Sequence, residues 1–469
     1  MTLPGPETFA ANARAALRDS TLTGALRRAT DTFAERRAGA IGQVPDWEGL
    51  RTRAAAIKAH TLARLDHYLE EFVANAERSG VVVHWAEDAA EACAIVRRLA
   101  GERGARRLVK SKSMATEEIH LNAALAQDGA EPVETDLGEW IIQLAGETPS
   151  HIIVPAIHKT KEAIGELFVD KLGIAKSSEP AVLAEHARTR LRAHFAAADM
   201  GISGVNFGVA ATGTILILEN EGNARMTTTL PRVHVAVMGI EKVIPRFADL
   251  EVFLKLLPRS GTGQHLTTYQ SLLTGPDPEG QGPRELHVVL LDNGRSRIAV
   301  DATMRQTLAC IRCGACLNAC PVYQSIGGHA YGSVYPGPIG AILTPQLAGM
   351  HSAGTLPFAS SLCGACKDVC PVKIDIPSLL LELRQRAVEG TAAQPRTRGS
   401  FVERLAWKAW AFCMRGPRRY RVAMALARFC EKLPFVRRLA GPMRAWASTR
   451  ELPTLAKRSF RSTWRGGAS

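Results

Sequence analysis

The clearest signal for a fold in the C-terminal part is the run Cys310-Ile-Arg-Cys313-Gly-Ala-Cys316-Leu-Asn-Ala-Cys320-Pro321. Its spacing, C-x2-C-x2-C-x3-C-P, is the one that bacterial ferredoxins use to bind iron–sulfur clusters. Thiolates three residues apart on a tight turn can converge on one small cluster, and Gly314 relieves backbone crowding where the chain curls. Pro321 then directs the chain away from the last cysteine. The pattern therefore predicts an iron–sulfur module.

A second run, Cys363-Gly-Ala-Cys366-Lys-Asp-Val-Cys370-Pro371, repeats the ending of the first run but lacks its first cysteine. Ser360 stands at that position. In two-cluster ferredoxins the fourth cysteine of a run binds the other cluster. The ligands expected from this rule are Cys310, Cys313, Cys316 and Cys370 for cluster 1, and Cys320, Cys363 and Cys366 for cluster 2.

The ligand count limits the kind of cluster at the second position. We expect two iron–sulfur clusters, with [4Fe-4S] as the type for both. Because cluster 2 has only three cysteines, it is either a [4Fe-4S] cluster with a non-cysteine fourth ligand or a three-iron [3Fe-4S] cluster. For the first alternative, the fourth ligand is Ser360 or a group from outside the chain.

Other uses of cysteine fit this pattern poorly. Zinc sites favour two separated C-x2-C pairs, or cysteine together with histidine. Disulfides need an oxidising compartment, and residues 1–7 have neither the basic nor the apolar region of a signal peptide. We therefore expect a cytoplasmic protein. Cys93, Cys413 and Cys430 stand singly and are expected to be small buried apolar residues.

The positive charge of the chain lies in its C-terminal tail. The formal net charge is +13, but residues 396–469 hold 18 Lys/Arg and 3 Asp/Glu, against 40 and 42 in the rest of the chain. Trp407, Trp410, Trp446 and Trp464 lie among these basic residues. Such a mixture predicts an amphipathic helix, which would contact the anionic inner face of a membrane or an acidic partner subunit. A solvated basic tail is the alternative, and no nucleic-acid-binding motif accompanies it.

The 469 residues are too many for one core, so several domains are expected. We expect a helical region over 1–75, an α/β domain over 76–300, the iron–sulfur module over 301–390 and a basic helical tail over 391–469. In the second part, short apolar runs alternate with helical stretches, which indicates an open α/β sheet with helices on its faces. The runs expected to be extended are 81–85, 108–109, 132–135, 140–143, 151–154, 214–219, 233–239 and 286–291.

Longer stretches of the chain resemble the lactate utilisation protein B family. They include Val109-Lys-Ser-Lys-Ser-Met-Ala-Thr-Glu-Glu-Ile119, Asn206-Phe-Gly-Val-Ala-Ala-Thr-Gly213, Glu219-Asn-Glu-Gly-Asn223 and Gly327-Gly-His-Ala-Tyr-Gly-Ser-Val-Tyr-Pro-Gly-Pro338. The resemblance covers essentially the whole chain, including the three-cysteine second run.

The resemblance implies a fold, a pathway and partners. The first large domain, the LUD domain, is similar in fold to the sugar-phosphate isomerase and CoA-transferase α/β group. The family is implicated in oxidising L-lactate to pyruvate, chiefly in electron transport. It acts beside a cysteine-rich protein of the heterodisulfide-reductase type and a smaller LUD-domain protein. The basic tail matches the C-terminal extension of these proteins.

Three functions are open at this point. In the first, the chain is an electron-transferring subunit, and Arg312, Lys367 and Lys373 beside the ligands either favour the reduced clusters or are solvated loop charges. In the second, the chain is itself the lactate dehydrogenase, although no dinucleotide-binding fingerprint is visible. The residues to inspect for that activity are Lys110, Lys112, Glu139, Glu219 and Arg225. In the third, the clusters are structural and the chain is an assembly or binding subunit.

Overall fold

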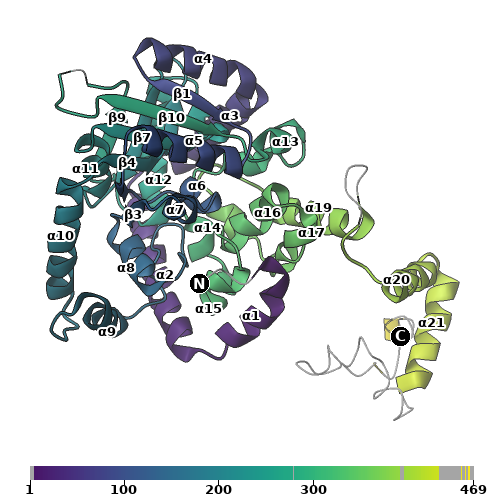
Figure 1. Cartoon of the computed structure of the whole chain (residues 1–469). Helices are drawn as coiled ribbons and strands as arrows, with labels where there is room; N and C mark the ends of the chain where they lie inside the picture. Colours follow the sequence, from purple (N-terminus) through teal and green to yellow (C-terminus); the bar gives the residue numbers. More distant parts are fainter. Residues whose placement is uncertain are drawn as a thin grey trace. The chain divides into compact units, whose positions relative to one another are not determined.

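The computed structural model describes residues 5–277, 279–390, 396–431, 456, 460, 463 and 464. The chain divides into two compact units, Met1–Thr397 and Arg398–Ser469 (Figure 1). The expected α/β domain and cysteine module therefore lie in the same compact unit. The finer domain boundaries at 75, 300 and 390 stay predictions.

The first part of the chain is helical, as its sequence predicts. Asp19 and Asp46 begin two of these helices, because their side chains accept hydrogen bonds from the amides of Leu22 at 2.9 Å and Gly49 at 2.7 Å. The helices are α1 (Phe9–Ala16), α2 (Ser20–Gly42), α3 (Trp47–Ala63) and α4 (Leu65–Arg78).

A six-stranded sheet in which all paired strands are parallel forms the centre of the α/β domain. Its strand order is β1-β10-β7-β4-β2-β3. Its strands are β1 (Val82–Ala86), β2 (Arg107–Lys110), β3 (Glu131–Glu134), β4 (Met200–Gly204), β7 (Val233–Gly239) and β10 (Glu285–Leu291). The helices of this domain are α5 (Ala89–Glu102), α6 (Met114–Glu118), α7 (Leu121–Ala126), α8 (Leu137–Ala145), α9 (Lys161–Leu172), α10 (Pro180–Ala196), α11 (Asn223–Thr229), α12 (Leu250–Gly261) and α13 (Arg295–Val300).

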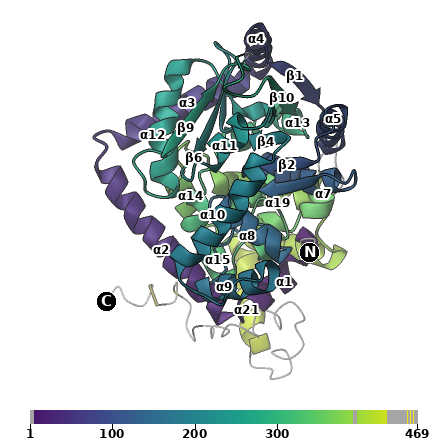
Figure 2. The same ribbon diagram turned by 60° about the vertical axis from the view of Figure 1, so that its left-hand side comes forward.

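Helices cover both faces of this sheet, which explains why its central strands read as continuous apolar runs. Successive side chains of β7 enter different cores, since strand side chains alternate between faces. Val235 and Val237 belong to the core that includes residues of α5 and α7, whereas Ala236 and Met238 belong to the core that includes residues of α4. Figure 2 shows α4 and α5 beside the edge strand β1 of this sheet. The predicted open α/β sheet is thus confirmed.

A smaller, four-stranded sheet contributes to the domain, in the order β8-β5-β6-β9. Its strands are β5 (Phe207–Val209), β6 (Thr214–Glu219), β8 (Val243–Ile244) and β9 (Tyr269–Leu273). The glycine-rich stretch 201–213 therefore supplies parts of two strands and the turn between β5 and β6. Gly213 has φ +66°, and a Cβ atom there would lie 2.2 Å from the backbone nitrogen of Ala76. Only glycine fits this close approach of the turn to α4.

Two of the expected strands are wrong. Residues 140–143 lie inside α8, because Asp136 accepts the amide of Glu139 at 3.0 Å and Gly146 ends the helix with φ 65°. A short apolar run fits a buried helix as well as a strand, which explains the error. Residues 151–154 form an irregular turn, since His151 Nδ1 accepts the amides of Ile153 and Val154 at 3.0 and 3.1 Å.

The cysteine module consists of short helices joined by turns, and the N-terminal helices pack on it. α2 contacts α14 and α15, and α3 contacts the turn before Cys310. The longer helices are α16 (Gly337–Leu347) and α19 (Ile376–Glu389), and the short ones are α14 (Ala315–Asn318), α15 (Pro321–Ile326), α17 (Met350–Ala353) and α18 (Ala365–Asp368).

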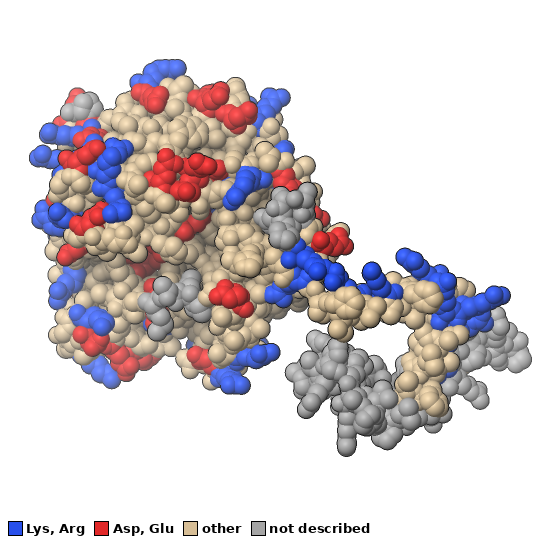
Figure 3. All heavy atoms as spheres, turned by 45° about the vertical axis from the view of Figure 1, so that its right-hand side comes forward, with Lys and Arg blue, Asp and Glu red and all other residues tan. Residues whose placement is uncertain are grey.

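The described part of the tail forms α20 (Phe401–Met414) and α21 (Pro417–Glu431). Basic side chains gather on it (Figure 3), and Trp407 and Trp410 are 61% and 54% exposed. None of the described helices is long and apolar enough to cross a membrane. Trp446, residues 391–395 and most of the tail beyond 431 lie outside the described residues. Contact of the tail with a membrane or a partner stays a prediction.

Candidate functional site: two cysteine sets and a cavity at the sheet edge

The two cysteine runs adopt the same local backbone conformation. Gly314 and Gly364, with φ 72° and 90°, immediately precede α14 and α18. Two residues earlier, Arg312 and Leu362 are also left-handed, with φ 61° and 56°. Non-glycine residues rarely adopt this conformation, so its occurrence in both runs marks a repeated fold of the ligand loop. The repeat is kept in the second run although Ser360 replaces the first cysteine.

Four cysteines from both runs line one cavity, which we call the cysteine cavity. Cys310, Cys313 and Cys316 come from the first run, and Cys370 comes from the second. Its apolar wall is formed by Ile152, Ile311, Ile339, Val372, Ile374 and Ile376. The structure thus brings together the four residues predicted to hold cluster 1.

In this cavity, burial and the negative charges of neighbouring thiolates oppose the deprotonation of each cysteine. Burial raises the pKa of Cys316 well above its usual range, and the neighbouring charges of Cys310, Cys313 and Cys370 raise it further. A bound metal centre would supply positive charge and favour the thiolate forms. The helices α14 and α18, which carry Cys316 and Cys366, contact each other, so the two predicted ligand sets lie close to each other.

The three cysteines predicted for cluster 2 also interact with one another. Burial raises the pKa of Cys366 to about 12, and the charges of Cys320 and Cys363 raise it further. Cys320 and Cys366 are buried, whereas Cys363 is exposed. This second set therefore reaches the protein surface, while the first set holds buried Cys313 and Cys370 and partly buried Cys310 and Cys316.

Backbone amides point at the sulfur atoms. The amide of Arg312 donates to Cys310 Sγ at 3.4 Å, and the amide of Ile374 donates to Cys370 Sγ at 3.3 Å. Such hydrogen bonds to sulfur stabilise the extra negative charge of a reduced cluster. Together with the apolar wall, they fit an iron–sulfur cluster held by thiolates. Within the described residues, no three His, Cys, Asp or Glu side chains converge on a single metal ion, so the fit to a cluster rests on the cavity lined by four cysteines.

Two arginines of the N-terminal helices, buried Arg51 and partly buried Arg37, donate to backbone carbonyls at the end of the second cysteine run. Arg51, from α3, donates to the carbonyl of Cys370 through Nε at 3.0 Å and Nη2 at 2.8 Å. Arg37, from α2, donates to the carbonyl of Val369 at 3.3 Å. Sequence reasoning missed both residues, because nothing in the helical region 1–75 indicates which of its many arginines contacts the cysteine runs.

Of the three cations expected beside the ligands, only Arg312 is buried. Its side chain is 8% exposed and lies 3.3 Å from the Glu241 carboxylate. Lys367 is 52% exposed and pairs with Asp375 at 2.5 Å. Lys373 is 37% exposed and pairs with Glu48 at 3.2 Å. Solvent screens the latter two, so Arg312 has the strongest electrostatic effect of the three.

The candidates for a dehydrogenase site do not form one group. Lys110 is buried and bonded to Glu134 at 2.7 Å and Glu117 at 3.0 Å, which is the pattern of a structural ion pair. Arg225 is exposed. Burial raises the pKa of Glu139 well above its usual range, but this residue does not line a described cavity.

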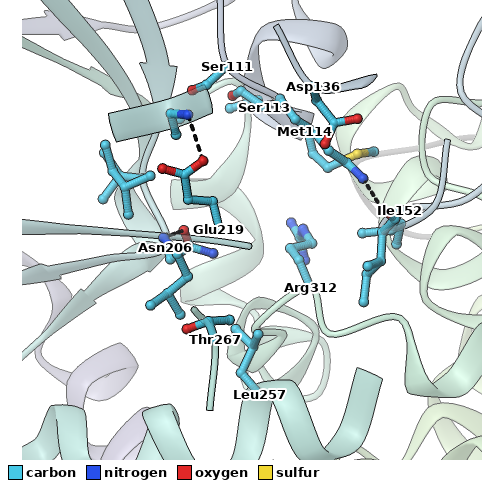
Figure 4. A pocket seen from close by; sticks show the side chains of 18 of the residues that line it. Ser111, Ser113, Met114, Asp136, Ile152, Asn206, Glu219, Leu257, Thr267 and Arg312 are labelled. Carbon is cyan, nitrogen blue, oxygen red and sulfur yellow. Dashed lines mark hydrogen bonds between the residues drawn. The ribbon is translucent and has the colours of Figure 1, made fainter. Parts of the chain in front are cut away.

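Lys112 and Glu219 line a second cavity of about 230 Å³, the sheet-edge cavity (Figure 4). It lies where β2, β4 and β7 end, and Arg312 of the cysteine module reaches into it from the other side. Glu219 accepts the amides of Ala224 at 2.7 Å and Arg225 at 2.6 Å. Its carboxylate thus holds the start of α11 rather than standing free for proton transfer.

Comparisons with known proteins agree with this architecture. The family model of the LUD domain matches residues 69–291, that of a 4Fe-4S dicluster domain matches 306–374, and that of the lactate utilisation protein B C-terminal region matches 382–467. A solved DUF162 family protein from Deinococcus radiodurans covers 48% of this chain and 98% of its own. Its 14% identity and TM-score of 0.29 are too low to extend the assignment.

Curated relatives align over nearly their whole length. Lactate utilization protein B of Geobacillus kaustophilus is 45% identical over 94% of this chain and 93% of its own. The proteins of the same name from Geobacillus thermodenitrificans and Bacillus licheniformis are 44% and 42% identical, over 96% and 97% of this chain and 94% and 96% of their own. The chain therefore belongs to the lactate utilisation protein B family, with a LUD domain followed by a ferredoxin-type iron–sulfur module.

Proposed function

We propose that this protein is the iron–sulfur electron-transfer subunit of a system that oxidises L-lactate to pyruvate. When bound, two clusters would accept and release single electrons. Cluster 1 is held by Cys310, Cys313, Cys316 and Cys370, and cluster 2 by Cys320, Cys363 and Cys366. We propose [4Fe-4S] for both, with [3Fe-4S] as the alternative for cluster 2.

One observation carries the proposal: a largely enclosed cysteine set, in which Cys313 and Cys370 are buried, lies next to a set that reaches the surface. The helices α14 and α18, which carry Cys316 and Cys366, contact each other, and Cys363 is exposed. Electrons could therefore pass between a protected cluster and a partner docked at the surface. The protein contributes apolar walls that exclude water, amides directed at sulfur and the buried cations Arg51 and Arg312, all of which adjust the cluster potential.

We propose the partners that the family resemblance implies, namely a cysteine-rich subunit of the heterodisulfide-reductase type and a smaller LUD-domain protein. The proposed location is the cytoplasm, with the basic tail at the inner face of the membrane. Exposed Trp407 and Trp410 among basic residues support this location. Sedimentation of the full chain with anionic but not neutral vesicles tests it.

A lactate dehydrogenase activity of this chain alone is less well supported. Lys110 is held in an ion pair and Glu219 binds two backbone amides. Oxidation of lactate also needs a flavin or nicotinamide cofactor, or an equivalent acceptor. Lactate turnover by the purified chain with an artificial acceptor would favour this alternative.

The cluster assignment is tested with Cys370→Ser and Cys320→Ser, using Cys413→Ser as a control outside both sets. The full chain is purified anaerobically and its iron, sulfide and electron paramagnetic resonance (EPR) spectra are measured. We expect Cys370→Ser to lose the spectrum of cluster 1, Cys320→Ser to lose that of cluster 2, and Cys413→Ser to retain both. In the complex, Cys313→Ser should abolish lactate-dependent reduction of the acceptor. Full reduction by that variant contradicts the electron-transfer role.

A further inference from the structure

The sheet-edge cavity lies at the switch point of the parallel sheet. β2 and β4 are neighbours in the sheet. The next strand after β2 is β3, which lies on the far side of β2, and the next strand of this sheet after β4 is β7, which lies on the far side of β4. Ligands of open α/β sheets bind in the crevice outside the strand ends at this point. Ser111 and Ser113, which follow β2, and Gly204 and Asn206, at the end of β4, all line the cavity. Its position is that of a ligand site.

Four cationic side chains line this cavity, and three of them have few acceptors, the exception being Arg295. The side chain of Lys242 makes no hydrogen bond or ion pair with any residue that the structure describes. Lys112 donates only to the carbonyl of Ile153. Arg312 has one acceptor, Glu241 at 3.3 Å, and its buried Nη1 has none (Figure 4). A buried cation without a full set of acceptors is destabilising. A bound anion would supply the missing acceptor for Arg312 Nη1.

The acidic side chains at the cavity are already engaged. Glu219 accepts two amides of α11, and Asp136 accepts the amide of Glu139 at 3.0 Å. Glu221 accepts the amide of Asn220 at 3.1 Å and is exposed. These carboxylates do not pair with Lys112 or Lys242.

Glu241 is shared between two arginines. Its Oε2 accepts from Arg295 Nε at 2.7 Å, and its Oε1 faces Arg312. Arg295 also binds Glu118, at 2.8 Å. Glu241 therefore neutralises Arg312 only in part, which leaves positive charge at the cavity.

Apolar side chains form part of the wall and indicate an organic ligand. Ile152, Ile153, Ile217 and Leu257 line the cavity beside the cations. An inorganic phosphate would leave these groups in contact with water, whereas a short carbon chain would cover them. The guanidinium of an arginine matches a carboxylate in shape and charge.

We propose that the sheet-edge cavity binds a small organic carboxylate, held by Arg312 and Lys242, and that its occupancy is coupled to cluster 1. The coupling follows from sequence position, because Arg312 stands between two proposed ligands of that cluster, Cys310 and Cys313. This part rests on the proposed function, whereas the binding site itself does not.

The coupling has a defined sign. Reduction adds negative charge to a cluster, so a neighbouring carboxylate should bind the reduced protein more weakly than the oxidised protein. By linkage, the bound anion lowers the reduction potential of the cluster by the same free energy. A tenfold weaker affinity of the reduced protein corresponds to about 59 mV for one electron.

The test uses the full chain, purified anaerobically, and calorimetric titration with sodium L-lactate, sodium pyruvate and sodium phosphate as probes. Arg312→Leu is a suitable variant, because Leu362 adopts the same left-handed conformation in the second run. Lys242→Gln changes no residue of the cysteine runs. Arg225→Gln is the matched control, since this exposed side chain does not line the cavity.

We expect saturable binding of a carboxylate to the oxidised protein, about tenfold weaker in Arg312→Leu and Lys242→Gln and unchanged in Arg225→Gln. The EPR-monitored potential of cluster 1 should fall when the carboxylate is added. Binding of phosphate alone, or equal affinities of Lys242→Gln and the unaltered chain, would overturn the site. If Arg312→Leu loses iron, its binding result cannot be compared with that of the unaltered chain, and the affinity of Lys242→Gln alone tests the site. If the chain purified anaerobically contains no iron or sulfide and still binds the carboxylate, the proposed function is overturned while the cavity assignment stands.

Discussion

The amide nitrogen of Leu362 lies 3.1 Å from Ser360 Oγ and donates a hydrogen bond to it. In the first run, the amide of Arg312 donates to Cys310 Sγ at 3.4 Å. Ser360 thus presents its oxygen where the matching cysteine presents its sulfur. Because both loops share a left-handed residue at the donor position, the serine retains the loop geometry of a ligand.

We expect Ser360 to complete the second cluster. Ser360→Ala should lower the iron content from about eight to about seven atoms per chain and produce the EPR signal of a three-iron cluster, whereas Ser360→Cys should keep about eight. Ser361→Ala, at the exposed neighbouring position, is the control. Identical iron contents and spectra for all these proteins would show that the hydroxyl group is not a ligand.

Lys110→Met should destabilise the LUD domain by about 3–5 kcal/mol. The substitution leaves Glu134, which is 3% exposed, without its buried cation. Urea unfolding followed by circular dichroism measures the change, and the double variant Lys110→Met/Glu134→Gln should recover part of the loss. Lys171→Met, at a side chain 49% exposed, should change the free energy of unfolding little. An unaltered unfolding curve for Lys110→Met would argue against a structural ion pair.

Gly328→Ala should loosen the contact between the iron–sulfur module and the turn at Ser150. A Cβ atom at Gly328 would lie 1.8 Å from the carbonyl oxygen of Ser150, which also accepts the Tyr323 hydroxyl at 2.7 Å. Relieving this clash should cost about 1–3 kcal/mol or more, measured as a lower melting temperature. Gly101→Ala, in α5 with no atom within 4 Å of the new methyl group, should instead stabilise the protein slightly.

His234 should make the protein less stable in acid. Burial lowers the pKa of His234 to about 3, and the ring is hydrogen-bonded to Ser203 Oγ at 2.7 Å. Between about pH 6.5 and 3 the unfolded chain binds a proton at this ring that the folded protein does not bind. The free energy of unfolding therefore decreases as the pH is lowered through this window, by about 1.4 kcal/mol per pH unit for this histidine.

The pH dependence is tested by urea unfolding at pH 6.0 and 5.0. His234→Gln should remove about 1.4 kcal/mol per pH unit from the slope, whatever its effect at neutral pH. His67→Gln, at an exposed side chain, serves as the control and should keep the slope. A slope in His234→Gln equal to that of the unaltered chain would mean that His234 is protonated in the folded protein.

Local sequence patterns predicted much of the fold. The apolar runs that became β7 and β10 are continuous because both faces of the sheet are covered. The pattern failed at 140–143 and 151–154. There the conformation depends on the side chains of Asp136 and His151, which satisfy nearby amides. β9 was not expected, because its side chains are only partly buried and its sequence carries a weak apolar signal.

The family, the two cysteine runs and the need for glycine at the turn of the first run were evident from the sequence, because these features depend on residues close together in the chain. The shared cavity of Cys370 and the first run agrees with the grouping predicted from cysteine spacing. In contrast, the bond from Arg51 of α3 to the Cys370 carbonyl and the reach of Arg312 to the edge of the sheet emerge only from the folded structure. Such contacts join residues far apart in the chain, so they depend on how the helices and sheets pack together rather than on local spacing.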